Sequence, residues 1–371
     1  MVDWSSSMTH TYEYYIVDPN TWADVKRVDT VKSCTINRDD GADTKGSATF
    51  DIVNSLGECY IRVYLITIQN GLTEKHPLGT FLVQTPSSSF DGKTRTVSMD
   101  AYTPLIELKE SQPPIGYYIP KRTNILDISY QLIRENARAP VIKTGGSTIS
   151  SDHFIADTSD TWLSFISDYI SNHIYNSTDW VSGEQVTIEH ACKYTLGLDE
   201  LGRIIFLPKQ DASALRPVWT YNDDNSSILY PDVSMTHDLY GIPNVVEVVY
   251  SKGSDSYYSK VVNDDPNSPT SIVARGREIP YRVTDPDLSG NPTQSQIDDY
   301  AERLLSELST LEYTISYTHG YCPVRLGDCV RLNYERAGIK NVKAKVISQS
   351  IKCEPGCPVS EKAVFTTKLW R

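Results

Sequence analysis

The chain has 371 residues, a hydrophobic fraction of 39%, 24 tyrosines and a formal net charge of −12. This composition excludes a disordered chain and indicates a folded protein rich in strand-forming residues, and the length predicts two or three domains. The negative charge excludes a protein that binds DNA freely, because affinity for phosphates needs a dominant basic surface. With no signal peptide and no apolar run long enough to span a membrane, the chain is expected to be soluble and made in the cytoplasm.

Alternating apolar residues predict a meander of strands over the first hundred residues. They recur at every second position in three segments: Tyr12, Tyr14 and Ile16; Ala48, Phe50 and Ile52; Ile61, Val63 and Leu65. Asn70-Gly71 and Asp91-Gly92 each predict a hairpin, because a two-residue type I′ turn needs positive φ at both positions. We therefore predict an antiparallel sheet or small β-barrel domain over residues 1–105.

An α+β domain is predicted over residues 106–216, after a linker rich in proline. Ile125, Ile128, Leu132 and Ile133 predict a helix that ends before Pro140. A second helix is expected from about Ser159, with an apolar face that runs to Ile170. Two short strands, 194–198 and 203–207, then predict a hairpin.

Residues 217–371 are predicted to form a second β-barrel domain. Val218–Tyr221 and the apolar run 245–249 predict strands, and residues 252–292 predict an exposed excursion with one strand near 272–283. Thr293 and Gln296 have the spacing of a capping box and predict the start of an amphipathic helix. We expect that helix to lie on the sheet that follows it. Its apolar face is predicted to consist of Ile297, Tyr300, Ala301, Leu304, Leu305 and Leu308.

Four strands are expected after this helix. The patterns predict them at Tyr313–Tyr317, from Cys329 after a Gly327-Asp328 turn, at Val342–Ile351 after an Ala337-Gly338 turn, and from Val364 to Leu369. From Tyr313 onward the net charge is +6, so the remainder of the chain carries −18. This asymmetry has two interpretations, a random variation on a solvated face or charge matching with neighbouring subunits or a stacked partner ring.

Cysteine is the first residue type that bears on chemistry. The odd total of seven predicts reduced thiols rather than a disulfide framework. Cys322, Cys329, Cys353 and Cys357 fall within 36 residues, and four thiolates are able to hold zinc or an iron–sulfur cluster. Their spacing lacks the tight knuckle of zinc ribbons, so free thiols are favoured and no metal ligand is predicted.

No catalytic site is predicted. The seven histidines form no metal-binding pair; they are His10, His76, His153, His173, His190, His237 and His319. Glu189, His190 and Cys192 are close in sequence, but the alternating pattern of 186–192 favours a structural histidine on a strand. The acidic pairs 223–224, 264–265 and 298–299 are expected in loops or at a helix start. Nucleophile-elbow, P-loop and dinucleotide-binding motifs are absent from the sequence, so neither an enzyme nor a cofactor is predicted.

The succession of several short motifs resembles the baseplate or tail-tip hub proteins of tailed bacteriophages. The motifs are "PLGTFLV", "VSMDAYTPLIEL", "LDELGRIIFLP", "GIPNVVEVVY", "PVRLGDCVRL" and "AKVISQSIKCEPG", which together cover roughly residues 77–370. The resemblance implies a fold of two barrel domains, each similar to a tail-tube subunit, with smaller α+β domains inserted between them. Three such chains form a ring with six similar positions, which matches a hexameric tube.

This resemblance implies a structural virion protein at the phage tail tip or baseplate. The implied partners are two further copies of the chain, the tail tube or distal tail ring, a spike, fibre or tip protein, and a tape-measure protein. DNA would pass through the ring without specific binding, because an acidic lining repels phosphate. The alternatives are a tail-associated peptidoglycan hydrolase or endopeptidase, and a carbohydrate-binding tip module suggested by the tyrosine content.

Overall fold

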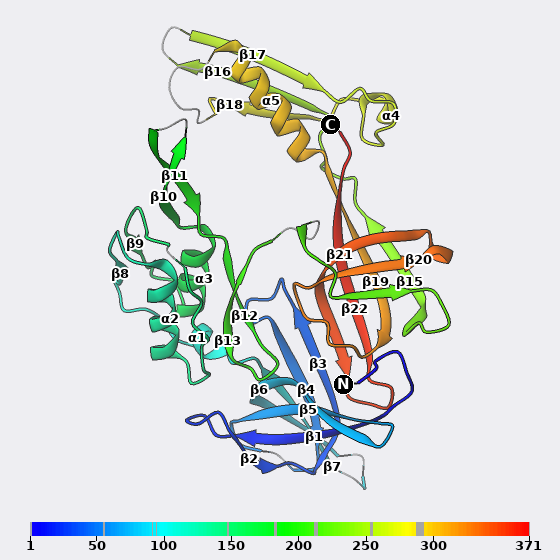
Figure 1. Cartoon of the computed structure of the whole chain (residues 1–371). Helices are drawn as coiled ribbons and strands as arrows, with labels where there is room; N and C mark the ends of the chain where they lie inside the picture. Colours follow the sequence, from blue (N-terminus) through cyan, green and yellow to red (C-terminus); the bar gives the residue numbers. More distant parts are fainter. Residues whose placement is uncertain are drawn as a thin grey trace. The chain divides into compact units, whose positions relative to one another are not determined.

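The computed structural model describes residues 2–370 apart from residues 55, 91, 94, 147, 182–183, 211–213, 253–254 and 287–292. The chain divides into two compact units (Figure 1). The first unit comprises Met1–Asp232 and Tyr317–Glu361, and the second comprises Val233–Ser316 and Lys362–Arg371. The finer division of the chain at residues 105 and 216 stays a prediction.

Most strands belong to one large, mainly antiparallel sheet. Residues of the first hundred supply β1 (Thr9–Val17), β2 (Asp24–Arg27), β3 (Val31–Asp39), β4 (Gly46–Ile52), β5 (Cys59–Gln69), β6 (Leu72–Phe90) and β7 (Arg95–Tyr102). The later part of the chain supplies β14 (Trp219–Asn222), β15 (Leu229–His237), β19 (Thr310–Gly320), β20 (Cys329–Tyr334), β21 (Ile339–Lys352) and β22 (Pro358–Lys368). A 3-10 turn, Glu335–Ala337, joins β20 to β21. The β-rich character predicted from the sequence is therefore confirmed.

The two ends of the chain share this sheet, because β3 pairs with β21 in antiparallel register. Ile36 lies opposite Ile351, and both side chains are buried. The pairing order is β15-β19-β22-β21-β3-β4-β7-β6-β5-β1-β2, with β20 branching from β21 and β14 pairing with β20. This order has two ends, so the described strands form no closed barrel. The two predicted barrel domains are not established by the pairing.

Alternate residues of β5 contribute to two different hydrophobic cores, which explains why nearly the whole strand is buried. Ile61 and Val63 face a core formed by the strands, whereas Tyr60 belongs to a core formed with the helices. In the neighbouring strand β6, Phe81 belongs to the first core and Leu82 to the second. Successive side chains of a strand point to opposite faces, so the sheet separates the two cores here.

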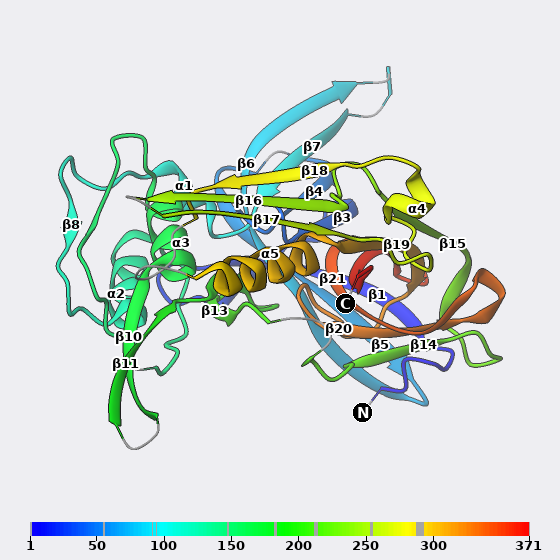
Figure 2. The same ribbon diagram turned by 90° about the horizontal axis from the view of Figure 1, so that it is seen from above.

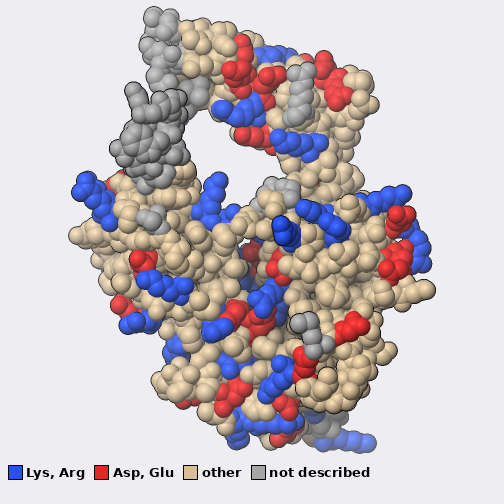
Figure 3. Space-filling model, viewed as in Figure 1, with Lys and Arg blue, Asp and Glu red and all other residues tan. Residues whose placement is uncertain are grey.

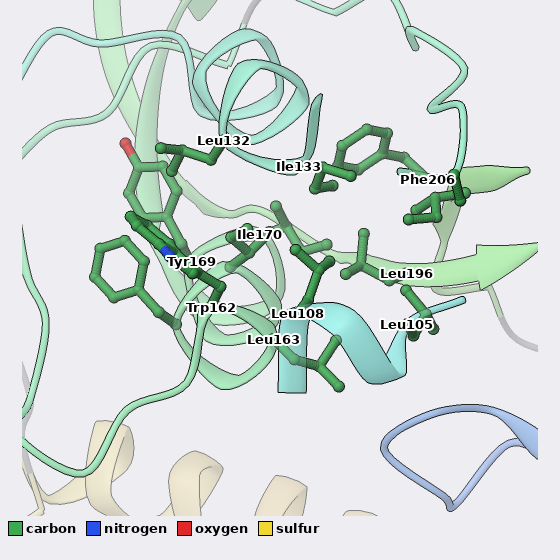
Figure 4. Close-up of a cluster of buried hydrophobic side chains, with 14 of the residues drawn as sticks. Leu105, Leu108, Leu132, Ile133, Trp162, Leu163, Tyr169, Ile170, Leu196 and Phe206 are labelled. Carbon is green, nitrogen blue, oxygen red and sulfur yellow. The ribbon is translucent and has the colours of Figure 1, made fainter. Parts of the chain in front are cut away.

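The core on the helical side joins three helices to a hairpin (Figure 4). The elements are α1 (Ile106–Glu110), α2 (Ile125–Asn136), α3 (Trp162–Asn172), β12 (Tyr194–Leu198) and β13 (Ile204–Pro208). Asn124 caps α2, and Thr161 forms a capping box with Ser164 at the start of α3. Both helices and the hairpin were predicted from the sequence. Two further pairs of strands lie in this region: β8 (Tyr118–Ile119) with β9 (Phe154–Ile155), and β10 (Ile174–Val181) with β11 (Glu184–Ala191).

The turn of the β12–β13 hairpin is fixed to the large sheet through the carbonyl oxygen of Leu201. Three donors converge on this oxygen: Trp22 Nε1 at 2.8 Å, Thr80 Oγ1 at 2.9 Å and Arg62 Nη2 at 3.3 Å. Arg62 is only 4% exposed and also binds Asp24 Oδ1 at 2.8 Å. Gly202 follows with a φ of 75°, in the left-handed region that favours glycine.

The second unit packs a helix on a three-stranded sheet (Figure 2). Its elements are β16 (Val245–Lys252), β17 (Asp255–Val262), α4 (Ile272–Arg275), β18 (Pro280–Thr284) and α5 (Gln294–Leu308). The predicted capping box of Thr293 and Gln296 is confirmed at the start of α5. Ile297, Ala301 and Leu305 are fully buried against Val246 and Val248 of β16.

One prediction for this region is wrong and another is incomplete. We expected α5 to lie on the sheet that follows it, but it packs on β16 and β17, which precede it. The exposed excursion predicted over residues 252–292 contains β17 and β18, which pair with opposite edges of β16. The strand expected near residues 272–283 is confirmed only in its last part, because residues 272–275 form α4 and β18 begins at Pro280. Polar residues in β17 hid its strand character, because only one face of this sheet is covered.

The Asn70-Gly71 hairpin is confirmed, with φ values of 51° and 77° between β5 and β6. The second predicted hairpin also exists, because β6 pairs with β7 from Phe90 and Arg95 onward. Its connection is longer than the two residues expected, and Asp91 lies outside the described residues. Gly92 has a φ of 92°.

Candidate functional site

A buried cluster of polar side chains lies inside the first unit and joins four strands of the large sheet. Tyr221 comes from β14, Tyr317 and His319 from β19, Gln349 from β21, and Glu361 from β22. Tyr317 and His319 share one face of β19, because side chains two residues apart point the same way. All five side chains are buried. We call these residues, together with Cys322, the buried polar cluster.

Glu361 is the acceptor at the centre of this cluster. Gln349 Nε2 donates to Glu361 Oε2 at 2.7 Å, and the Tyr317 hydroxyl donates to Glu361 Oε1. His319 Nε2 lies 3.4 Å from Glu361 Oε2. The carboxylate thus meets three donors on two strands, which offsets the unfavourable burial of its charge.

His319 holds a proton at Nδ1, because that nitrogen lies 2.7 Å from the carbonyl oxygen of Gly320, which only accepts. Its Nε2 lies 3.2 Å from the Tyr221 hydroxyl, which is itself 3.3 Å from Cys322 Sγ. Burial alone lowers the pKa of His319, but Cys322 and Glu361 outweigh burial and raise that pKa to about 10. His319 is therefore an imidazolium paired with the Glu361 carboxylate at neutral pH.

The two tyrosines are held in their neutral form. Burial, and then the Glu361 charge, raise the pKa of Tyr221 and of Tyr317 well above the usual value. The side chains of His319 and Glu361 are 0% exposed, so a substrate in solvent does not reach them in this conformation. The arrangement joins the strands through a network of buried hydrogen bonds.

Arg38 of β3 extends this network to the N-terminal strands. Its Nη1 donates to Gln349 Oε1 at 3.0 Å, and its Nη2 donates to the carbonyl oxygen of Leu78 in β6 at 2.7 Å. Gln349 Nε2 also donates to the carbonyl oxygen of Val324 at 3.0 Å. Strands from both ends of the chain are therefore joined through one chain of hydrogen bonds.

A groove of about 770 Å³ lies beside this cluster in the first unit. Hairpin β12–β13, the start of β4, β6 near Gly79 and the segment 325–329 line it. Charges of both signs meet there: Asp40 lies 3.3 Å from Lys45 Nζ and 3.2 Å from Lys345 Nζ, and Glu200 pairs with Arg325. On the face drawn in Figure 3, Lys and Arg are likewise interspersed with Asp and Glu. This distribution does not form the dominant basic surface that phosphate binding needs.

The four cysteines considered as metal ligands lie in three surroundings. Cys322 contacts Tyr221, Cys329 is buried on β20, and Cys353 and Cys357 pack against the strand core that contains Cys34. The part of the chain that the structure describes holds no group of three or more side chains arranged to bind a metal ion. The absence of a metal stays a prediction.

The histidine and the acidic pairs considered in the sequence contact neighbouring side chains and backbone groups or lie exposed to solvent. His190 lies exposed on β11 with its ring stacked on Tyr175, while the side chain of Glu189 lies outside the described residues. Asp223 binds Arg336 Nε at 2.7 Å, Asp224 accepts from the backbone of Ser226, and Asp265 accepts from the backbone of Asn267. Asp298 and Asp299 are exposed in the second turn of α5, and the first turn of this helix contains no acidic residue.

Sequence reasoning missed the buried polar cluster. His319 was treated as one of seven scattered histidines, and Glu361 was not considered. A signal was present: His319 continues the inward face of Ile315 and Tyr317, and Glu361 stands between Val359 and Ala363 at inward positions of β22. A charged residue at an inward position needs a partner, which predicts a buried pair.

Comparison with known proteins is informative at the level of structure. No family model and no curated protein matches the sequence. A tail protein from Neisseria meningitidis MC58 is similar in structure with a TM-score of 0.59 and 12% identity, over 97% of this chain and 98% of that chain. The 43 kDa tail protein of prophage MuSo2 from Shewanella oneidensis is similar with a TM-score of 0.56 and 10% identity, over 95% of this chain and 98% of that chain. A chain of the Francisella PdpA–VgrG complex is similar with a TM-score of 0.53 and 8% identity. The similarity covers 96% of this chain and 53% of that chain.

The chain therefore has the fold of phage and prophage tail proteins, and the resemblance inferred from the order of sequence motifs is confirmed at the level of fold. The helices within the described residues are all too short or too polar to cross a lipid bilayer.

Proposed function

We propose that the chain is a structural hub of a phage tail tip or baseplate, in which three copies form a ring that joins a hexameric tail tube to the tip or spike. The observation that carries this proposal is the similarity of fold to tail proteins over nearly the full length of both chains. Fold alone supports many functions, so the proposal also depends on how the strands are distributed.

The strands of the large sheet come in two groups of similar size. Within the described residues, seven lie between Thr9 and Tyr102 and six between Trp219 and Lys368. We infer that each group corresponds to one unit similar to a tail-tube subunit, as in the predicted pair of barrel domains. Three copies would then present six similar positions to a six-copy tube, which resolves the mismatch between three-fold and six-fold symmetry.

The ends of the large sheet supply edges for contacts between copies. β2 and β15 terminate the pairing order, and every residue of β2 is exposed. An unpaired edge strand offers backbone N–H and C=O groups to another chain. We infer that such edges pair across subunit boundaries when the ring forms, and that a tip, spike or tape-measure protein occupies the remaining faces.

A structural role fits the buried polar cluster better than a catalytic one. Its ionised pair is enclosed by protein and holds strands together, as a component that carries mechanical load requires. The net charge of −12 is compatible with a ring through which DNA passes without adhering, because like charges repel. We propose no enzymatic activity and no cofactor.

The proposal is tested by mixing the purified chain with the tail-tube protein encoded by the same phage or prophage. Light scattering after size exclusion is expected to find a complex with three copies of this chain for each six-copy tube ring. A zymogram of the chain alone is expected to leave bacterial cell wall intact. Clearing of the wall, together with a failure to bind the tube protein, would favour the hydrolase alternative and overturn the proposal.

A further inference from the structure

Two cysteines face each other where the N-terminal and C-terminal strands pair. Thr35 of β3 lies opposite Lys352 of β21, so the next position of the same register places Cys34 opposite Cys353. The backbone N–H of Cys353 donates to the carbonyl oxygen of Cys34 at 2.9 Å, which holds the two residues side by side just beyond the end of β21.

Both side chains point to the same side of the sheet. Cys34 and Ile36 are buried in the strand core, and Cys353 packs against that core while remaining partly exposed. Cα atoms of a hydrogen-bonded antiparallel pair are about 5.5 Å apart. This separation lies within the range of about 4.4–6.8 Å that disulfides span.

We propose that Cys34 and Cys353 are a redox-responsive pair that forms a cross-strand disulfide when the protein meets a disulfide oxidant such as oxidised glutathione. The Cys353 thiolate attacks one sulfur of the oxidant, a mixed disulfide forms and one glutathione thiolate leaves. The Cys34 thiolate then attacks Sγ of Cys353 and releases the second glutathione. Both cysteine thiols are oxidised and one oxidant molecule is reduced to two glutathione thiols, because the two protons lost by the cysteines are taken up by the two departing glutathione thiolates.

The surroundings set the order and the rate of these steps. Cys353 is the partly exposed member of the pair, so it meets the oxidant first. Burial, followed by the contact with Cys353, raises the pKa of Cys34 well above the usual value. The second step is therefore slow at neutral pH and accelerates at alkaline pH, because Cys34 must lose its proton before it attacks.

The bond would close a loop that spans most of the chain and fix the pairing of β3 with β21. This is the pairing through which the two ends of the chain share one sheet. A reducing compartment keeps the thiols free during assembly, and an oxidising medium outside the cell adds the covalent link afterwards. The adjacent thiol of Cys357 is the competing partner for Cys353, and burial raises its pKa to about 12.

The test is to incubate the full-length chain with oxidised glutathione at pH 7 and pH 9 and to map disulfides by mass spectrometry. We expect one bond between Cys34 and Cys353, faster formation at pH 9, and a rise in Tm of at least about 5 °C that dithiothreitol reverses. Cys34→Ser is expected to stop at the mixed disulfide on Cys353, whereas Cys357→Ser is expected to form the bond as the wild type does.

Three results would overturn the proposal: a bond between Cys353 and Cys357, a stable mixed disulfide on Cys353 in the wild-type chain, or no reaction. Cys34→Ala provides a second variant of the same size class, so that a folding defect in the serine variant does not decide the outcome. Circular dichroism of each reduced variant establishes that it is folded before oxidation is measured.

Discussion

Gln349 and Glu361 are joined by a hydrogen bond of 2.7 Å that links β21 to β22 inside the first unit. Gln349 also accepts from Arg38 of β3, so the carboxylate of Glu361 is connected to strands from both ends of the chain. Removal of any one side chain from this series of hydrogen bonds leaves a neighbouring donor or acceptor buried without its partner, which is strongly unfavourable. Removal of one member of the cluster is therefore expected to lower the stability of the first unit.

Glu361→Ala is expected to lower the free energy of unfolding by about 3 kcal/mol, because it leaves the buried His319 charge without its carboxylate and removes the acceptor of the Tyr317 hydroxyl and of one Gln349 N–H. Urea denaturation followed by circular dichroism measures the change. Glu335→Ala removes an exposed carboxylate near the same sheet and is expected to change stability by less than about 0.5 kcal/mol. Equal effects of the two substitutions would show that the cluster contributes no special stability.

Stability is expected to fall as pH rises from 6.5 to 8.5. The pKa of His319 in the folded protein is raised to about 10, above its value of about 6.5 in an unfolded chain. The stabilisation from its charged form is therefore complete below pH about 6.5 and is lost progressively as the pH approaches 10. Urea midpoints at pH 6.5, 7.5 and 8.5 measure this slope.

Two variants separate His319 from other groups in the pH experiment. His319→Gln is expected to remove most of the slope, since glutamine does not titrate. His153→Gln changes an exposed histidine and is expected to leave the slope as in the wild type. The range stops at pH 8.5 because buried tyrosines with raised pKa values affect stability only at higher pH, and the slope that buried thiols such as Cys34 add near pH 8.5 is common to all the variants. A wild-type slope that survives in His319→Gln would contradict the assignment.

Gly202→Ala is expected to destabilise the first unit by at least about 2 kcal/mol. Its φ is 75°, and an added Cβ would lie 2.6 Å from Cβ of Thr80, a residue that helps to fix the hairpin turn. Gly116→Ala is the matched control, with a φ of 76° and open space around the added Cβ, and is expected to lose only about 1 kcal/mol. A smaller loss at Gly202 than at Gly116 would show that the contact with Thr80 relaxes freely.

Leu305→Ala is expected to lower the stability of the second unit by about 3 kcal/mol, because Leu305 is fully buried between α5 and its sheet. Asp299→Ala, on the exposed face of the same helix, is expected to change it by less than about 0.5 kcal/mol. Hydrogen exchange of β16 and β17 measures both effects within this unit. Unchanged protection in Leu305→Ala would mean that α5 does not stabilise the sheet.

Local patterns predicted elements well but not their partners. The capping residues Thr293 and Gln296 and the apolar spacing from Ile297 onward predicted α5 correctly, since both depend on neighbours along the chain. The apolar spacing indicates only that α5 packs on some apolar surface. It does not identify the strands, so the predicted partner, the sheet that follows α5, is wrong. Pairing of β3 with β21 joins residues more than 300 positions apart, and no local pattern encodes that contact.

The buried polar cluster was missed for the same reason. The inward position of Glu361 follows from its alternation with Val359 and Ala363, but its partners come from other strands. The partner of His319 likewise cannot be identified from its own strand, because Glu361 reaches it only through the pairing of β19 with β22. The resemblance to tail proteins is confirmed at the level of fold because it depends on the order of motifs across roughly residues 77–370 rather than on one local pattern.

We propose that three copies of the chain form a ring that meets a six-copy tube. Cryo-electron microscopy of the assembled tail, with this chain located by a fused tag, counts these copies. We expect three copies around the tail axis, each placing two similar β-rich parts against two tube subunits. A single copy beside the axis, or a ring of six whole chains, would contradict it.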